Sequence, residues 1–556
     1  MGMNELIEIT VGKMLEKQAL DLPSHLAIKY TDRDYERTYK EFNDEIDTVA
    51  KGFLKAGIKK GDHVAIWATN VPEWIITLFA TAKIGAVLVT VNTNYKVYEL
   101  EYLLKQSDSV AIVMIDGFKS TNYVEIINKL IPELRDSIPG ELECEKLPFL
   151  KKVIYAGEKT PAGMMNFSEL YELSKECDHQ EFLDIYENLD CHEIINMQYT
   201  SGTTGFPKGV MLTHFNIVNN GKQIGDCMKF TKDDKLCICV PFFHCFGLVL
   251  AIMASYTHGT SMIPIDAFSP IKVMKALEAE KCTAVHGVPT MFIAMLEHPE
   301  FKTFDFSHMR TGIMAGSPCP VKVMSDVVEQ MNMSEITIVY GQTESSPGCT
   351  QTTTDDSLEL RVSTVGRAFP GIECKIVDPE TGKDLPPNTP GEFCAKGYNI
   401  MRGYYKMPEA TANAIDENGW LHTGDIAVMD ENGYYKITGR IKDMIIRGGE
   451  NIYPKEIEEF IYTHEQVKDV QVIGVPSKAY GEEIMACIVL KDGATVTEDE
   501  IKEFVQSNMA RHKVPSYVKF TDSFPMTASG KIQKFKMREA AIEELGLQDA
   551  AKIETA

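Results

Sequence analysis

The chain has 556 residues, of which 44% are hydrophobic and 24% charged, a composition typical of a globular protein of roughly two to four domains. Its 56 lysine and arginine residues face 80 aspartate and glutamate residues, and the net charge of −24 argues against a nucleic-acid-binding protein. The 13 cysteines include no CxxC pair, the first residues read as a short amphipathic helix rather than a secretory signal, and the longest apolar run, 245–256, is too short to cross a bilayer. We therefore expect reduced thiols, a cytoplasmic protein and no transmembrane segment.

Strand-like and helix-like segments alternate up to about residue 400. Short runs rich in valine and isoleucine predict strands at 63–68, 86–91 and 109–115, with helices at 72–84 and 97–104 between them. This alternation is typical of buried parallel strands joined by crossover helices. We therefore predict an α/β fold with a large N-terminal domain of parallel-type sheets.

The character of the chain changes twice after these elements. The Gly- and Pro-rich segment 366–401 predicts an antiparallel sheet or a small β-barrel-like subdomain. Beyond residue 439 the order of elements suits a small α+β domain. We place the domain boundary between residues 441 and 442, so that the two domains are 1–441 and 442–556. The elements predicted in the second domain are a helix at 455–462, strands at 470–475 and 483–490, a helix at 498–508 and a frayed end from residue 548.

A segment rich in hydroxyl groups and glycine, 199–209, follows the predicted strand 194–199. Its glycines allow close approach of backbone N–H groups to an anion, its hydroxyl groups can donate to phosphate oxygens, and its lysine adds a positive charge. It does not match the Walker pattern, and a flexible surface loop is the alternative interpretation. The candidate phosphate-binding residues are Thr200, Ser201, Gly202, Thr203, Thr204, Gly205 and Lys208.

With this segment the chain resembles the acyl-adenylate-forming superfamily, which includes acyl-CoA synthetases, aryl-CoA ligases, luciferases and adenylation domains of peptide synthetases. Several motifs occur in the family's order over nearly the whole chain. The resemblance implies that a carboxylic acid reacts with ATP to give acyl-AMP and pyrophosphate, and that the acyl group then passes to coenzyme A. It also implies Mg²⁺, contact of the 199–209 segment with the pyrophosphate part of ATP, and a mobile C-terminal domain.

The second motif, 340–344, offers an aromatic ring, a glycine, an amide, a hydroxyl and a carboxylate. An adenine can stack on Tyr340, and Glu344 can bind Mg²⁺ through oxygen, although a helix start capped by Thr343 is an alternative. The resemblance implies that Tyr340, Gly341, Gln342 and Thr343 line the nucleotide site, and that Glu344 binds the metal together with Thr204.

The resemblance also assigns roles to residues nearer the C-terminus. Asp425 is expected to accept the ribose hydroxyls, a geometry that suits a carboxylate, with Arg440 and Asn451 nearby. Lys442 is the expected hinge. Lys531, which by itself would be interpreted as a solvated surface residue, matches the adenylation lysine that offsets the meeting of two anions. Where the family often has an arginine three residues later this chain has Lys534, which puts CoA or phosphate contacts at that position in doubt.

The same resemblance gives candidate positions for CoA and for the acyl group. Gly448, Gly449 and Glu450 would form a strip of backbone for the pantetheine arm, although a glycine turn before a proline-started helix explains them equally. His244 is expected to position or gate the carboxylate and the thiol route. The expected acyl-binding residues, which a plain hydrophobic core would also explain, are His244, Phe246, Val288, Met291, Gly316 and Gly341.

The sequence does not identify the carboxylic acid substrate. Acetyl-CoA synthetases carry a tryptophan at the position of Gly341, so we expect an acid longer than acetate here, and the pattern is closest to medium- and long-chain fatty acyl-CoA synthetases. Straight-chain, branched and aromatic acids remain alternatives, as do a carrier-protein-loading enzyme and a luciferase-like enzyme. A purely nucleotide-binding regulatory module is disfavoured by Lys531, Glu344 and Asp425. A homodimer is common in the family.

Overall fold

The computed structural model describes residues 5–201, 206–316, 319, 321–379, 381–440, 445–452, 454–491, 493–525 and 534–552. Among the residues discussed below, Ser201, Arg440 and Asn451 are described by their backbone alone.

An eight-stranded sheet carries the three strands that were predicted first. β3 pairs in parallel with both β4 and β5, and the intervening helices are α3 (Pro72–Lys83) and α4 (Val97–Gln106), as the alternating pattern predicted. The sheet continues into an antiparallel hairpin, β10–β11. In spatial order its strands are β22 (Gly403–Tyr404), β11 (Pro207–Thr213), β10 (Ile194–Ser201), β4 (Val87–Thr90), β3 (His63–Trp67), β5 (Ala111–Met114), β8 (Lys152–Tyr155) and β9 (Met165–Asn166).

A second sheet of seven strands is parallel except at its β2 edge. Helix α3, helix α8 and the fully apolar π-helix η3 share one large buried cluster with strands of both sheets, so this cluster joins the two sheets, and a second cluster packs on the seven-stranded sheet. In spatial order the strands are β16 (Glu335–Thr337), β15 (Thr311–Met314), β14 (Ala284–Gly287), β12 (Lys235–Ile238), β13 (Ser261–Pro264), β1 (Leu26–Lys29) and β2 (Glu36–Thr38). The helices around both sheets are α1 (Val11–Asp21), α2 (Tyr39–Lys55), α5 (Tyr123–Leu130), α6 (Glu169–Leu173), α7 (His179–Tyr186), α8 (His214–Cys227), η3 (Phe246–Met253), α9 (Ala254–Thr257), α10 (Pro270–Ala279), α11 (Pro289–Leu296) and α12 (Val321–Gln330).

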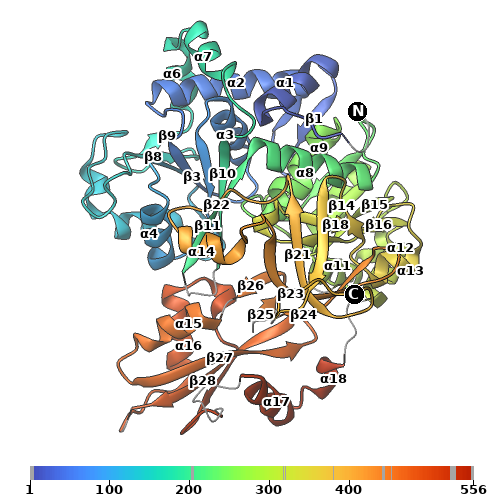
Figure 1. Cartoon of the computed structure of the whole chain (residues 1–556). Helices are drawn as coiled ribbons and strands as arrows, with labels where there is room; N and C mark the ends of the chain where they lie inside the picture. Colours follow the sequence, from blue (N-terminus) through green and yellow to red (C-terminus); the bar gives the residue numbers. More distant parts are fainter. Residues whose placement is uncertain are drawn as a thin grey trace.

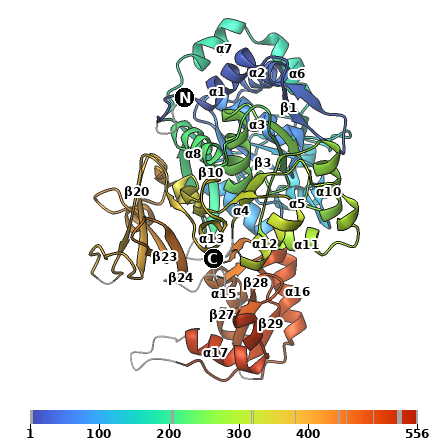
Figure 2. The same cartoon turned by 90° about the vertical axis from the view of Figure 1, so that its right-hand side faces the viewer.

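Two smaller antiparallel sheets follow. The Gly- and Pro-rich segment forms antiparallel strands, as predicted, and Figure 2 shows their sheet as a lobe beside the two larger sheets. The strands of the first small sheet are β17 (Val339–Gly341), β18 (Gly348–Gln351) and β19 (Arg367–Ala368). Those of the second are β20 (Ile372–Val377), β21 (Gly391–Gly397), β23 (Leu421–Met429) and β24 (Tyr435–Arg440). The short helices in this part are η5 (Thr343–Ser345), α13 (Leu358–Ser363) and α14 (Pro408–Ala414).

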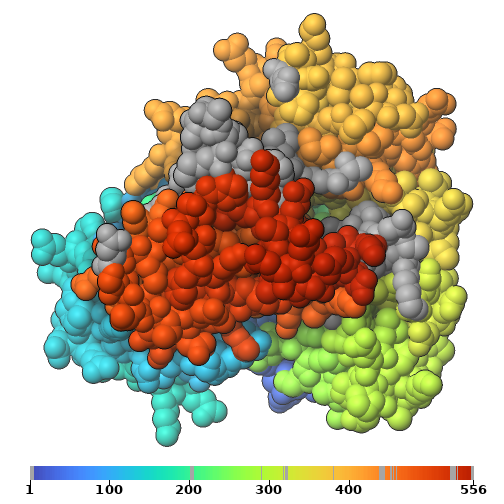
Figure 3. Space-filling model, turned by 90° about the horizontal axis from the view of Figure 1, so that it is seen from below, coloured from blue at the N-terminus to red at the C-terminus, as the bar shows by residue number. Residues whose placement is uncertain are grey.

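The C-terminal segment, residues 445–552, has hydrophobic clusters of its own. It lies below the rest of the chain in Figure 1, and Figure 3 shows it from below, lying across the face of the larger part. Its predicted helices and strands are confirmed within three residues at each end. They are β25 (Ile445–Arg447), β26 (Glu450–Ile452), α15 (Pro454–Tyr462), β27 (Val467–Ser477), β28 (Gly481–Leu490), α16 (Glu498–Asn508), η6 (Arg511–Lys513), β29 (Tyr517–Phe520), α17 (Lys534–Glu544) and α18 (Gln548–Ala551).

Two local expectations were wrong. Residues 548–551, which were expected to be frayed, form the short helix α18. Residues 5–10 are not helical, since α1 begins only at Val11, where the Thr10 side chain accepts the N–H of Lys13 at 3.2 Å and caps the helix. The boundary predicted between residues 441 and 442 lies outside the described residues.

Candidate active site

The hairpin of β10 and β11 holds the predicted phosphate-binding segment. Its two strands stay in register up to the pairs Thr200–Lys208 and Ser201–Pro207. Tyr102 of α4 braces the second strand, because its ring stacks on Phe206 at 4.9 Å and its hydroxyl donates to the Pro207 carbonyl at 3.0 Å. The described ends of the segment are therefore held by strand pairing and by Tyr102, while Gly202, Thr203, Thr204 and Gly205 lie outside the described residues.

The carboxylate of Glu344 lies beside this hairpin. Its Oε1 accepts the Tyr404 hydroxyl at 2.8 Å and lies 3.4 Å from the Thr200 hydroxyl. The Lys208 ammonium lies over the Tyr404 ring, 4.6 Å from its centroid. The structure thus brings the predicted metal ligand together with two predicted phosphate-binding residues. Tyr404 joins them, and sequence reasoning missed it because nothing in its local pattern points to Glu344.

The loop from Gly341 to Ser345 connects this region to the expected acyl site. Gln342 N–H donates to the Ser345 hydroxyl at 3.1 Å, which fixes the short helix η5. The Thr343 hydroxyl lies 3.7 Å from the Cys245 sulfur, next to His244. A β-carbon at Gly341 would lie 1.8 Å from the carbonyl oxygen of Pro347. Any side chain at position 341 therefore requires the loop to move.

The expected ribose site lies on the small antiparallel sheet. The buried Asp425 accepts the Tyr340 hydroxyl at 2.8 Å, and its register partner on β24 is Arg440. Burial, together with the neighbouring Asp425 carboxylate, holds the pKa of Tyr340 well above its ordinary value, so this phenol stays a neutral donor. Its ring packs edge-on against Phe393, with centroids 4.9 Å apart.

A second carboxylate, which sequence reasoning missed, supports Asp425. Glu392 on β21 accepts the N–H of Gly424 at 3.0 Å and lies 2.9 Å from Nδ1 of His422, whose Nε2 lies 3.7 Å from Asp416. These contacts fix the irregular stretch of β23 that presents Asp425.

Three of the expected acyl-binding residues, Gly316, Val288 and Phe246, lie close together. A β-carbon at Gly316 would lie 3.1 Å from Val288 and 3.9 Å from Phe246. The Phe246 ring stacks on the buried His286, with centroids 6.1 Å apart. Met291 lies on helix α11, and its N–H donates to the Val288 carbonyl at 2.9 Å.

The C-terminal segment places the expected CoA-binding strip, Gly448–Glu450, beside Val288. Gly449 has a φ of +85°, and a β-carbon there would lie 2.8 Å from Val288. Glu450 interacts electrostatically with His244: burial raises the pKa of Glu450 and lowers that of His244, and each partly offsets the shift of the other. Nδ1 of His244 accepts the Phe246 N–H at 3.2 Å, which assigns the proton of a neutral ring to Nε2. The preceding Gly448 N–H donates to the Tyr480 carbonyl at 2.9 Å.

Two further predicted residues, Lys442 and Lys531, lie outside the described residues. Lys534 is held within the C-terminal segment, where its ammonium donates to Glu458 at 2.6 Å and to the Val472 carbonyl at 3.1 Å. Its contacts are thus structural ones, consistent with the doubt raised by its departure from the family pattern.

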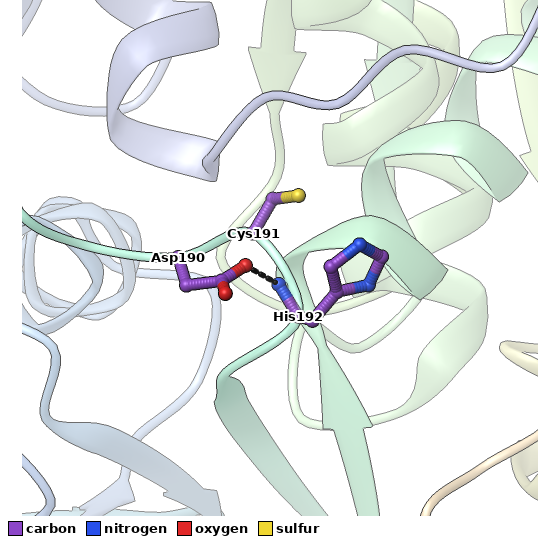
Figure 4. A group of neighbouring side chains, drawn as sticks. All are labelled: Asp190, Cys191 and His192. Atoms are coloured by element: carbon purple, nitrogen blue, oxygen red, sulfur yellow. Dashed lines mark hydrogen bonds between the residues drawn. The ribbon is translucent and has the colours of Figure 1, made fainter.

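Among the described residues, two groups have side chains close enough to share a metal ion, and neither includes Glu344. One is Glu392 with Cys394 and His422. The other, Asp190, Cys191 and His192, lies on the turn before β10, where the Asp190 carboxylate accepts the His192 N–H at 2.9 Å (Figure 4). Hydrogen bonds within the protein account for the first group, and the second consists of three consecutive, largely exposed residues, so we assign no metal to either.

Comparison with protein families decides the class. The AMP-binding enzyme model matches residues 15–405, and the model of the AMP-binding enzyme C-terminal domain matches residues 456–531. This chain is a member of the AMP-binding enzyme family. No helix in the described part of this AMP-binding enzyme is long and apolar enough to cross a membrane.

Individual relatives cover nearly the full length of this family member. It is 55% identical over 548 residues to a Bacillus subtilis protein with the provisional name acyl-CoA synthetase YngI, covering 99% of this chain and 100% of that one. It is 40% identical over 546 residues to the human mitochondrial medium-chain acyl-CoA ligase ACSF2, covering 97% and 88%. Among solved structures, a double mutant of o-succinylbenzoate CoA synthetase (MenE) from Bacillus subtilis, bound with its product analogue, superimposes with a TM-score of 0.79 and 25% identity over 96% of this chain and 99% of that one.

Proposed function

We propose that this protein is an AMP-forming acyl-CoA synthetase that activates a medium- or long-chain fatty acid. A carboxylate oxygen bonds to the α-phosphorus of ATP as the bond to pyrophosphate breaks. The CoA sulfur then bonds to the acyl carbon, AMP leaves, and the thiol proton is released. The observation that carries the proposal is that Gly449 of the C-terminal segment lies against Val288, one of the expected acyl-binding residues, while Glu344 lies beside the β10–β11 hairpin. The 13 free cysteines fit a reducing compartment such as the cytoplasm.

The side chains present suit a magnesium nucleotide. Asp425 and Tyr340 offer an acceptor and a ring for ribose and adenine, and Lys208 and Glu344 both contact Tyr404, which suits a lysine that serves the phosphates beside a metal ligand. Glu344 would hold Mg²⁺, which supplies charge neutralisation at the phosphates. Lys531, carried on a C-terminal domain that turns about Lys442, would act in the adenylation step.

The contact of Gly449 with Val288 favours the CoA-dependent half of the reaction. A backbone strip beside the acyl pocket suits the narrow pantetheine arm, and the likeness to a CoA synthetase bound with its product analogue covers both parts of the chain. Because Nδ1 of His244 accepts a backbone N–H and its pKa is lowered, its neutral ring presents an Nε2–H donor. That donor suits orienting a carbonyl rather than removing a proton.

The similarity to a medium-chain acyl-CoA ligase supports a fatty acid as substrate. An aromatic acid is the second candidate, favoured by the similarity to o-succinylbenzoate CoA synthetase. Each buried methylene contributes only about 0.8 kcal/mol, so discrimination between neighbouring chain lengths should be shallow.

The test is CoA-dependent AMP formation with acids from acetate to palmitate, benzoate and coumarate included. We expect a broad maximum at medium or long chains, and a maximum at benzoate would favour the aryl alternative.

Lys531→Ala should abolish pyrophosphate exchange yet still convert supplied acyl-AMP to thioester, because the lysine is needed only while two anions meet. Equal loss of both steps would contradict its assigned role.

A further inference from the structure

A buried ion pair joins the C-terminal segment to the larger part of the molecule. Glu99 lies on helix α4 and Lys513 on the short helix η6, and the lysine ammonium donates to Glu99 Oε1 at 3.0 Å. Their side chains are only 2% and 3% exposed. A charge pair from which water is excluded is strongly sensitive to the loss of one partner, unlike a surface pair.

The Glu99 carboxylate has contacts on both sides of this interface. Its Oε2 accepts the N–H of Lys96 at 2.9 Å, which caps the start of α4 in its own part of the chain. Its Oε1 accepts the Ala510 N–H at 3.2 Å in addition to Lys513. Two donors of the C-terminal segment therefore meet one acceptor held rigidly by helix α4.

Lys513 has a second anionic partner within its own segment. Its ammonium donates to Glu456 of α15 at 2.6 Å. Burial alone would lower the pKa of Lys513, but Glu456 and Glu99 outweigh that effect and raise it, so the lysine stays charged. When the C-terminal segment turns away, Lys513 keeps Glu456 while Glu99 regains water. The pair across the interface can thus form and break without leaving a bare ammonium in the core.

Loop 510–514, which carries Ala510 and Lys513, is also connected to the strip Gly448–Glu450 beside the expected acyl site. Arg447, directly before Gly448, donates to the carbonyls of His512 at 3.0 Å and Val514 at 3.2 Å. The contacts therefore run from Glu99 through loop 510–514 and Arg447 to Gly449, which rests against Val288. When loop 510–514 is bound to Glu99, these contacts also hold the Gly448–Glu450 strip against Val288.

We propose that Glu99 and Lys513 form a positioning pair that selects the thioester-forming orientation of the C-terminal segment. This role rests on the proposed function, in which the segment takes a second orientation for adenylation. The pair touches no reacting atom. Its effect is on the population of one orientation, so it should act on one half-reaction and spare the other.

The experiment compares Glu99→Gln with wild type in the two half-reactions. The isosteric amide keeps the shape but removes the charge, so thioester formation from supplied acyl-AMP should slow by about 10-fold or more, with pyrophosphate exchange unchanged within about twofold. Lys513→Gln should show the same bias, and the double variant should be no slower than the slower single variant. Glu101→Gln, which removes an exposed pair with Lys105 on the same helix, is the matched control and should leave both steps unchanged.

Hydrogen exchange supplies a readout that needs no turnover. Glu99→Gln should increase exchange at the Ala510 amide and at the Gly448–Glu450 strip, with thermal unfolding confirming a folded protein. Equal slowing of both half-reactions, or unchanged exchange at these amides, would overturn the positioning role. If wild type itself activates none of the acids, the proposed function fails, while the exchange result still decides whether the pair holds the segment.

Discussion

Tyr404 shows how one side chain can organise a site that local motifs describe only in parts. Its hydroxyl donates to Glu344, and its ring faces the Lys208 ammonium. The same residue thus orients the proposed metal ligand and steadies a proposed phosphate contact. Tyr404 itself is only 8% exposed, so its position is fixed by packing.

Removing this hydroxyl should weaken nucleotide handling without unfolding the protein. A hydrogen bond to a charged group is worth about 1.5–3 kcal/mol, so Tyr404→Phe should lower kcat/KM for MgATP about 10-fold or more in pyrophosphate exchange. Tyr405→Phe is the matched control, because the Tyr405 hydroxyl donates to Asp108 at 2.9 Å. Equal kcat/KM in the two variants would remove Tyr404 from the site.

At the scale of elements, the turn between β25 and β26 is the part of the C-terminal segment that contacts the proposed acyl site. Gly448 and Gly449 have φ values of +58° and +85°, a region that side chains disfavour. The turn packs against Val288 at the start of α11, so an element of the C-terminal segment completes a wall of the proposed acyl pocket.

A methyl group in this turn should impair the CoA step selectively. Gly449→Ala combines a strained φ with a β-carbon 2.8 Å from Val288, so we expect thioester formation to fall about 10-fold or more while adenylation persists. Gly493→Ala separates the two causes, since Gly493 has a φ of +80° and nothing within 4 Å of its β-carbon position. If both variants lose the same activity, backbone strain and not the contact is responsible.

At the scale of the whole molecule, buried imidazoles couple folding to pH. Burial lowers the pKa of His214 to about 3, that of His286 to about 4 and that of His512 to about 3, from an ordinary value of 6.5. Below pH 6.5 the unfolded chain binds protons at these residues that the folded chain does not. Their contribution to stability is therefore present above pH 6.5 and is lost as the pH falls towards 4.

This linkage predicts a steep acid destabilisation. Each such histidine should lower the free energy of unfolding by about 1.4 kcal/mol per pH unit in this window. Denaturant titrations from pH 7 to pH 4.5 measure the slope, which should be shallower for His214→Gln than for wild type. A stability that stays level from pH 7 to pH 5 would contradict neutral burial of these rings.

The fold could largely be predicted, because buried parallel strands and amphipathic helices carry their periodicity in the local sequence. The roles of positions 340–344 and 425 were inferred from the family resemblance, because their local chemistry leaves other interpretations open, and they stay predictions. Contacts between distant residues could not be predicted. Tyr404 and Glu344 are 60 residues apart, and Lys513 and Glu99 are 414 apart, so only the packing of sheets and segments brings them together. The N-terminal residues misled because hydrophobic spacing gave no sign that Thr10 delays the helix.

The contact between Gly341 and the Pro347 carbonyl bears on any attempt to redesign chain-length preference. Introducing a tryptophan at position 341 to narrow the cavity would displace main chain that also carries Glu344, so lost activity would say little about selectivity. An engineer would do better to graft the entire segment 341–348 from a short-acid enzyme, or to vary Val288, the side chain that lies between Gly316 and Gly449.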